Sequence, residues 1–288
     1  MTSTVDRPAL AVVATPIGNL GDITARAVET LKASDMVLAE DTRNTGRLLA
    51  HLGINATLKA VHDHNERDAA PGLLEKIKQS EMLVSLVSDA GTPTISDPGY
   101  HLVRAAHAAG INVFAVPGAC AAIAALSVAG LPSNSFTFEG FLPPRATARL
   151  DRLRTLSTAP QTTILYEAPH RLAALLDDVA TVYEPTREIV IARELTKLHE
   201  TLYRGTVADI RGIVEQDAYA ERGELVVLLG PAAEQASADQ ARVLATLKAA
   251  LRYLGPRDAA HLTAELTGAK PNAVYKMSLD LANADPHS

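Results

Sequence analysis

Short apolar runs alternate with amphipathic segments through the first 130 residues of the chain. Each run has the length and the Val, Leu and Ala content of a buried strand in a parallel sheet, and each amphipathic segment carries apolar residues at helical spacing. Strands are expected at 9–15, 35–40, 57–61, 82–87 and 111–116, with a helix after each. This alternation predicts a doubly wound α/β domain over residues 1–130.

A second alternating region follows the turn-forming residues 130–134. Its pattern predicts strands at 136–140, 162–167, 188–193, 200–205 and 224–229, with helices at 147–156, 171–182 and 207–215. We assign it to a second α/β domain over residues 131–232. Residues 233–288 comprise a linker and a tail with apolar residues at helical spacing. The tail pattern fits a helix-turn-helix-like module, and it fits a packing or dimerisation element equally well.

The segment SDAGTPTISDPG, residues 88–99, departs most clearly from this periodicity. It separates the apolar strand at 82–87 from a helix expected to begin at residue 100. Connections between a strand and a helix usually take about two to six residues, whereas this one has twelve residues and two carboxylates. Open α/β sheets bind ligands at the carboxyl ends of their strands. We therefore expect the segment to form part of a ligand site.

Composition and charge describe a globular protein without a broad positive field. The 288 residues are 47% hydrophobic and carry a formal net charge of −6, so any nucleic-acid site must be local. The single cysteine, Cys120, excludes an intramolecular disulfide framework and suits a reducing cytoplasm. The first residues contain no apolar signal core, and Pro117-Gly118 interrupts the uncharged segment 113–131. We therefore expect a soluble, cytoplasmic protein with no membrane span.

Common catalytic fingerprints are missing. The patterns GxGxxG, GxxxxGK[ST], HExxH and GxSxG are absent, which removes the usual support for dinucleotide, P-loop, zinc-protease and serine-hydrolase sites. Acids and bases gather instead beside Gly or Pro at predicted strand ends, which favours one shared cleft over separate solvated loops. His62 and His64, with Asp63 or Glu66, have the chemistry of metal ligands. No second cluster has suitable spacing, so no metal site is predicted.

Arg145, Arg149 and Arg152 lie at positions i, i+4 and i+7, and therefore on one face of the helix expected after GFLPP. Such a face can hold phosphate groups, and it can equally be a solvated helix surface. The sequence leaves both interpretations open.

Eight motifs follow one another along the chain. They are ATPIGNLGDIT (14–24), AEDTRNTGRLL (39–49), HDHNE (62–66), VSDAGTPTISDPGYHLV (87–103), VPGACAAIAALSVAGLPS (116–133), FEGFLPPR (138–145), YEAPHR (166–171) and ARELTK (192–197). With KPNAVYKMSL in the tail, they resemble the tetrapyrrole methylase superfamily and, within it, the ribosomal RNA small subunit methyltransferase I family. The resemblance covers nearly the whole chain. YEAPHR and VPGACAA vary at single positions within patterns that are otherwise intact.

The resemblance implies two α/β domains of tetrapyrrole methylase type, a cofactor cleft between them, and a small helical C-terminal domain. It implies S-adenosylmethionine as cofactor, 16S rRNA within the small ribosomal subunit as partner, and a homodimer. The implied reaction is methylation of the ribose 2′-hydroxyl of cytidine 1402 in 16S rRNA. Cys120 would be a packing residue beside the cofactor and not a nucleophile. By position in the family motifs, cofactor contacts are expected at Pro16, Asp89, Thr92, Ala119, Cys120, Tyr166, Leu195 and Gly223.

The implied reaction needs a group that accepts the proton of the ribose hydroxyl. Glu40, Asp41 and Glu167 are the favoured catalytic bases, because carboxylates at strand ends can be desolvated and their pKa values raised. Asp41 could instead cap the following helix, and Glu167 could pair with Arg171. Further candidate bases are His64, Asp97 and His170. RNA contacts are expected at Arg43, His64, Asn65, Arg145, Arg149, Arg171, Arg193 and Lys197.

Two alternative functions stay open. A tetrapyrrole C-methyltransferase has the same fold, but its first loop is of the VGxGPGDP type, whereas this chain has TPIGNLGDI. A noncatalytic ribosome-assembly factor would use the fold only to bind RNA. The net charge of −6 argues against broad RNA affinity and favours recognition of a folded ribosomal particle.

Overall fold

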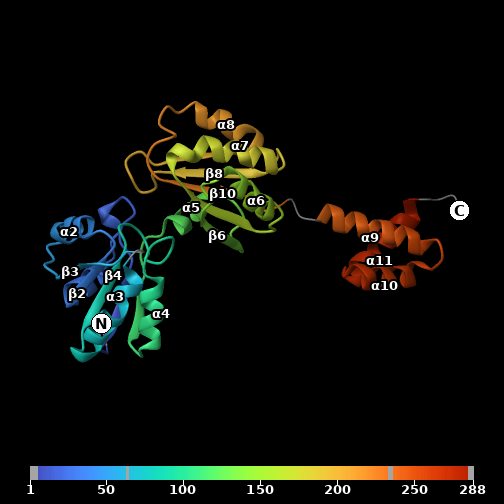
Figure 1. Cartoon of the computed structure of the whole chain (residues 1–288). Helices are drawn as coiled ribbons and strands as arrows, with labels where there is room; N and C mark the ends of the chain where they lie inside the picture. The colour runs from blue at the N-terminus through green and yellow to red at the C-terminus, as the bar shows by residue number, and fades with distance from the viewer. Residues whose placement is uncertain (1–5, 63–64, 233–235, 285–288) are drawn as a thin grey trace. The chain divides into compact units, whose positions relative to one another are not determined.

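The computed structural model describes residues 6–62, 65–232 and 236–284. The chain divides into two compact units, Met1–Gly230 and Pro231–Ser288. The first unit contains two five-stranded sheets, and the second contains helices (Figure 1). The predicted domain boundaries at 130/131 and 232/233 stay predictions.

The first sheet is wholly parallel. It orders its strands β3-β2-β4-β1-β5, where the strands are β1 (Ala9–Val13), β2 (Met36–Ala39), β3 (Leu58–Ala60), β4 (Leu83–Val87) and β5 (Asn112–Val116). The helices are α1 (Ala25–Ala33), α2 (Thr42–His51), α3 (Glu66–Gln79) and α4 (Tyr100–Ala108). Leu10 and Leu86 pack on α3 and α4, whereas Val37 and Val87 share the opposite core with α1 and α2. The predicted doubly wound arrangement is confirmed.

Side-chain oxygens accept hydrogen bonds from backbone N–H groups at the start of three of these helices, and in two of them the acceptor is the N-cap residue itself. The Thr24 hydroxyl accepts a hydrogen bond from Ala27 N at 3.1 Å, so Thr24 caps α1. Asp41 caps α2 by accepting from Arg43 N at 2.8 Å. Glu66 is buried in the first turn of α3 and accepts from Leu102 N at 2.6 Å, which satisfies a free N–H at the start of α4.

The uncharged segment 113–131 forms strand β5, a turn and helix α5 (Ala121–Ala129), as the sequence predicted. Over residues 6–62, 65–232 and 236–284, no helix is both long enough and apolar enough to cross a membrane.

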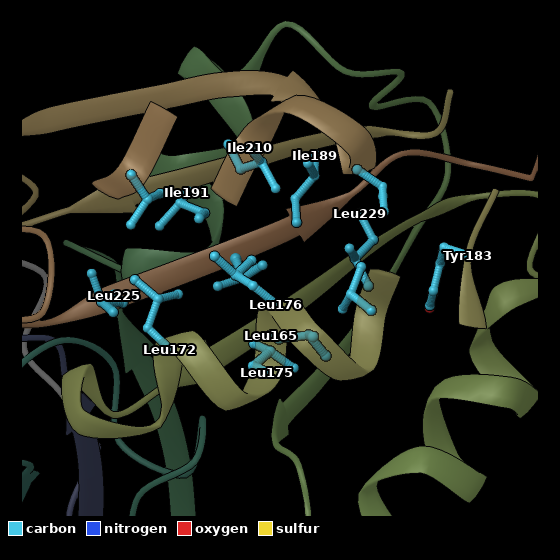
Figure 2. Packing of buried hydrophobic residues seen from close by; sticks show 14 of the residues in the cluster. Leu165, Leu172, Leu175, Leu176, Tyr183, Ile189, Ile191, Ile210, Leu225 and Leu229 are labelled. Atoms are coloured by element: carbon cyan, nitrogen blue, oxygen red, sulfur yellow. The ribbon is translucent and has the colours of Figure 1, made fainter. Parts of the chain in front are cut away.

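The second sheet is mixed. Strands β6 (Phe136–Phe141) and β7 (Thr162–Glu167) pair in parallel, and β10 (Leu225–Leu229), β8 (Glu188–Arg193) and β9 (Thr201–Thr206) continue the sheet by antiparallel pairing. The helices α6 (Ala146–Ser157), α7 (Leu172–Val182) and α8 (Val207–Glu215) contribute to one core with these strands. Figure 2 shows Leu172, Leu175 and Leu176 of α7 in this core with Ile189, Ile191 and Leu225.

Helix α5 covers the other face of the second sheet. Ala122, Ala125 and Leu126 of α5 share a core cluster with Ile164 of β7 and Leu228 of β10. Because α5 directly follows β5 of the first sheet, this packing holds the two sheets in one unit.

The second unit contains α9 (Ala236–Leu251), α10 (Pro256–Thr267) and α11 (Pro271–Ala284). Leu247, Ala260 and Val274, one from each helix, are buried in a common core. Gly268 adopts φ 73° and ends α10, a conformation that favours glycine. The predicted helical tail is confirmed.

Candidate active site

A cavity of about 350 Å³ lies where loops of the two sheets meet in the first unit. The first sheet contributes the loop after β4 and the start of α5. The second contributes the ends of β7 and β8 and the turn before β10. Segment 88–99, expected to form part of a ligand site, borders this cavity through residues 90–92 and 95–97.

Seven of the sequence-predicted residues line the cavity: Thr92, Asp97, Cys120, Tyr166, Glu167, Leu195 and Gly223. The lining does not include Pro16, Asp89, Ala119, Glu40 or Asp41. Sequence reasoning missed Ile17, Ile95, Phe141 and Ala192, which do line it. Ile17 and Phe141 stand inside the motifs PIGN and GFLPP, so their motifs were found while their apolar side chains gave no chemical signal.

Asp89 joins two loops of the first sheet. Its Oδ1 accepts a hydrogen bond from Asp41 N at 3.1 Å, and its Oδ2 accepts from Asn44 Nδ2 at 2.7 Å. The next residues turn toward the cavity, where the Thr92 hydroxyl donates to Ala119 O at 3.0 Å. Asp89 therefore positions the loop after β4, and the Ala119 carbonyl oxygen accepts a hydrogen bond from Thr92 of the same loop.

The carboxylate of Asp41 is hydrogen-bonded to Arg43 at the protein surface. The Arg43 guanidinium donates to both of its carboxylate oxygens, with Nη2 to Oδ2 at 2.6 Å and Nε to Oδ1 at 3.0 Å. These bonds lower the pKa of Asp41 to about 2. Asp41 is thus a helix cap and a poor proton acceptor, and Glu40 beside it is half-buried at the end of β2.

Glu167 has the opposite environment at the end of β7. Its side chain is 1% exposed, its Oε1 accepts from Ala168 N at 2.8 Å, and Arg171 Nε lies 3.1 Å from the same oxygen. Its Oε2 is buried without a hydrogen-bond partner among the described residues. Burial raises the pKa of Glu167 against the opposing effects of Ala168 N and Arg171. A carboxylate in this state is a stronger proton acceptor than an exposed one.

Tyr166 forms an aromatic wall of the cavity. Its hydroxyl accepts a hydrogen bond from Ala122 N at 3.2 Å, and its ring makes T-shaped contacts with Phe138 and Phe141. Burial raises the pKa of Tyr166, so the phenol stays neutral. Cys120 lies beside it and lines the cavity.

The ARELTK motif forms a strained loop after β8 that is hydrogen-bonded to the loop after β1 and to the turn before β10. Glu194 and Thr196 adopt positive φ angles of 51° and 66°. The Thr196 hydroxyl accepts from Asn19 N of the first sheet at 3.1 Å. Glu194 Oε1 accepts from Lys197 Nζ at 2.7 Å and from Glu224 N at 3.0 Å. Since Leu195 and Glu224 both line the cavity, Glu194 connects two parts of its wall.

The predicted RNA contacts separate into buried and accessible groups. Arg149 is buried and its Nε donates to Asp178 Oδ2 at 2.6 Å, while Arg193 is buried and donates to the Tyr203 hydroxyl at 3.2 Å. Their burial does not fit the predicted contact with RNA, because both guanidinium groups serve the interior of the second sheet's domain. Helical spacing placed Arg149 and Arg152 on one face of α6, but the two side chains have different partners. Arg149 pairs with Asp178 of α7, whereas Arg152 pairs with Glu139.

The side chains of the other predicted RNA contacts are more accessible to solvent. Arg43 and Arg145 are exposed, and Arg171 and Lys197 are partly exposed. Asn65 accepts from His62 N at 2.9 Å, which fixes the turn before α3. His64 lies outside the described residues.

The ionisable side chains that line the cavity are acidic, and two of them have a basic partner outside the lining: Arg171 lies 3.1 Å from Glu167 and Lys197 lies 3.3 Å from Glu224. Asp97, Glu167 and Glu224 line the cavity, and no Lys, Arg or His is among the described residues of its lining. Such a wall suits a ligand with positive charge and disfavours the phosphates of a nucleotide cofactor. This explains physically why no phosphate-binding fingerprint is needed.

Comparison with known proteins agrees with this arrangement. The family model Tetrapyrrole (Corrin/Porphyrin) Methylases matches residues 9–211, and the RsmI C-terminal HTH domain matches residues 237–282. The protein named ribosomal RNA small subunit methyltransferase I from Escherichia coli O157:H7 is 49% identical over 94% of each chain. Its namesake from Xylella fastidiosa (strain Temecula1 / ATCC 700964) is 52% identical over 92% of this chain and 97% of that one. The chain belongs to the ribosomal RNA small subunit methyltransferase I family of tetrapyrrole methylases.

A solved structure has a similar fold. Uroporphyrin-III C-methyl transferase from Thermus thermophilus, complexed with S-adenyl homocysteine, aligns with a TM-score of 0.53 at 17% identity. The alignment covers 77% of this chain and 96% of that chain. At this identity the likeness supports the fold alone.

Proposed function

We propose that the protein transfers the methyl group of S-adenosylmethionine to the 2′-hydroxyl of cytidine 1402 in 16S rRNA, within the small ribosomal subunit. The names of its relatives support rRNA as the substrate class. The single observation that carries the proposal is the acidic cavity with Glu167 in its wall, because it combines a place for a cationic methyl donor with a proton acceptor.

The residues of the cavity fit S-adenosylmethionine. A volume of about 350 Å³ lies in the usual range for small-molecule sites. When bound, the cofactor supplies a methyl group on a positively charged sulfur. Thr92, Cys120, Tyr166, Leu195 and Gly223 form the contact wall. Asp89 and Ala119 accept hydrogen bonds that position its loops, and Pro16 is buried next to Ile17 of the lining. Gly91, at φ 80°, leaves room in that wall, since a Cβ there would meet Ile17 Cγ2 at 3.3 Å.

Glu167 is the general base of the proposed reaction. With the cofactor bound, Glu167 would accept the proton of the ribose hydroxyl while the oxygen bonds to the methyl carbon and the carbon–sulfur bond breaks, which would release S-adenosylhomocysteine. The raised pKa suits Glu167 to this role. The hydrogen bond from Ala168 N orients the carboxylate through Oε1, beside which Arg171 places a positive charge, and Oε2 is the oxygen proposed to take the proton. Neither Asp41 nor Glu40 lines the cavity, and Asp41 caps α2.

Arg43, Arg145, Arg171 and Lys197 are the proposed phosphate contacts, and Asn65 stabilises a neighbouring RNA-facing turn. The formal charge of −6 favours a folded ribosomal particle over naked RNA. We further propose that the protein acts in the cytoplasm as a homodimer.

The test is methyl transfer from labelled S-adenosylmethionine to three acceptors: small ribosomal subunits that lack the modification, naked 16S rRNA, and a tetrapyrrole precursor. Ribose methylation mapped to cytidine 1402, with subunits preferred over naked RNA, is the expected result. Transfer to the tetrapyrrole alone would establish the C-methyltransferase alternative. Tight RNA binding without transfer would favour an assembly factor.

A further inference from the structure

Phe141 is an aromatic side chain left exposed at the edge of the cavity. It lines the cavity and keeps 56% of its surface accessible. Ile95, from the loop after β4, lines the same cavity and is 36% exposed. Single exposed apolar residues are common on protein surfaces, so exposure alone does not indicate a site. The local backbone and the ring contacts supply the further evidence.

A bulge in β6 sets the direction of Phe141. Phe138 pairs with Ile164, and the next pair joins Gly140 to Leu165, so Glu139 is the extra residue. Because side chains alternate along a strand, one extra residue moves Phe141 to the face opposite the one that an unbroken strand would give it. Bulges are frequent beside active sites, where they redirect a side chain.

Gly140 makes this bulge possible. It adopts φ 66°, and a Cβ at this position would meet Ser96 Oγ at 2.7 Å. The bulge therefore approaches the loop after β4 closely, and Ser96 of that loop lines the cavity. A glycine is required here both by its backbone conformation and by the space that it leaves.

Tyr166 holds the Phe141 ring from one side. The two ring centroids are 5.8 Å apart at an interplanar angle of 66°, and Tyr166 is itself fixed by Phe138 and by Ala122 N. A T-shaped contact engages at most one face of a ring, so another face of Phe141 stays available. The ring is thus oriented in advance at the cavity edge.

We propose that this open face of Phe141 stacks on the unstacked base of the target nucleotide. The inference rests on the proposed function, because it assumes an RNA ribose as the methyl acceptor. Proteins that bind unpaired RNA stack its bases on aromatic side chains. A base stacked on Phe141 places its own ribose beside the cavity, where the hydroxyl meets the methyl donor and Glu167. Stacking accepts every base, so Phe141 positions the nucleotide without selecting cytosine.

The experiment compares Phe141→Ala, Phe141→Leu and Phe141→Tyr with the wild type. Phe136→Ala is the matched control, since Phe136 lies on the same strand, is 40% exposed and does not line the cavity. Two quantities are measured for each: kcat/KM for unmodified small subunits, and the Kd of S-adenosylmethionine by calorimetry. Loss of one stacked base corresponds to a decrease in kcat/KM of roughly 5- to 150-fold for Phe141→Ala.

The expected pattern is a loss of kcat/KM in Phe141→Ala and Phe141→Leu, retention in Phe141→Tyr and in the control, and a Kd that changes by a much smaller factor than kcat/KM in every variant. Wild-type kcat/KM in Phe141→Ala or Phe141→Leu would overturn the inference. A Kd weakened by the same factor as kcat/KM would also overturn it, because the ring would then serve the cofactor. If the wild type transfers no methyl group to RNA, the proposed function itself fails, and the wild-type measurement alone reveals this.

Discussion

Two strand ends in this protein carry a carboxylate followed closely by an arginine, yet their environments are opposite. After β2, Asp41 is bonded by Arg43 at the surface, and its pKa falls to about 2. After β7, Glu167 is buried beside Arg171, and its pKa is raised. The same pair of residue types therefore has two different roles. After β2 the acid caps a helix, and after β7 it lines the cavity. Burial, and not residue type, makes the difference.

The largest effect is expected from Glu167→Gln. Without a carboxylate to accept the hydroxyl proton, turnover should decrease by roughly 10²- to 10⁴-fold, a much larger factor than any weakening of S-adenosylmethionine binding caused by the loss of one wall charge. Because Glu167 must be ionised to act, wild-type turnover should also decrease as the pH falls through its raised pKa. Single-turnover methyl transfer measured across pH provides both results.

Asp41→Asn is the control for this comparison. It keeps a capping oxygen for Arg43 N and lies outside the cavity lining, so its turnover should stay close to wild type. Undiminished turnover in Glu167→Gln, or an equal loss in both variants, would contradict the roles assigned to the two carboxylates.

The same contrast between buried and exposed pairs occurs on α6. Arg149→Ala leaves Asp178 without its buried partner and should lower the free energy of unfolding by about 3–5 kcal/mol. Arg154→Ala removes an exposed pair with Asp151 on the same helix and should cost less than about 1 kcal/mol. Urea denaturation of both variants measures the difference, and similar losses would show that burial of the Arg149 pair contributes little.

Glu194→Gln tests the loop that connects two parts of the cavity wall. Burial alone would raise the pKa of Glu194, but hydrogen bonds from Lys197 and Glu224 N lower it, so the carboxylate is charged and holds both groups. Loss of the charge should weaken S-adenosylmethionine binding roughly fivefold. Glu215→Gln, which affects an exposed pair with Arg211 on α8, should leave the affinity unchanged. Equal Kd values in calorimetry for both variants would remove Glu194 from the positioning residues.

The smallest effect concerns pH and stability. Asp41 has a folded pKa of about 2 against an ordinary value of 3.8, so its contribution is complete above pH 4 and is lost as the pH falls toward 2. Glu167 has a raised pKa, so its ionisation destabilises the fold as the pH rises through that value. Denaturation of Asp41→Asn and Glu167→Gln across pH should therefore give difference curves of opposite sign. Parallel curves would contradict the two environments.

Local pattern predicted most of the strands and helices. β7, β8 and α8 were placed at their observed bounds, because apolar runs and helical spacing are local properties of the chain. The motif loops were also found, since Gly, Pro and charged residues interrupt those patterns visibly. Thr92, Cys120, Tyr166, Leu195 and Gly223 line the cavity that these loops share.

Residues whose role depends on a distant partner were not predictable in the same way. Arg149 and Arg152 look alike on a helical wheel, but only Arg149 faces Asp178 of α7. Asp89 was expected at the cofactor, yet it joins the loop after β2, a contact between segments far apart in the sequence. Phe141 carried no polar signal, and a bulge brings it to the cavity edge.

The sequence by itself determined the alternation of strands and helices, the helical tail and the family, because each depends on short-range pattern or on motifs that can be read in order. The tertiary structure alone decided which carboxylate is buried, which arginines face the interior and which apolar side chains border the cavity. These properties depend on desolvation and on contacts between distant segments, and neither quantity is encoded at a single position. Asp41 and Glu167 differ for that reason.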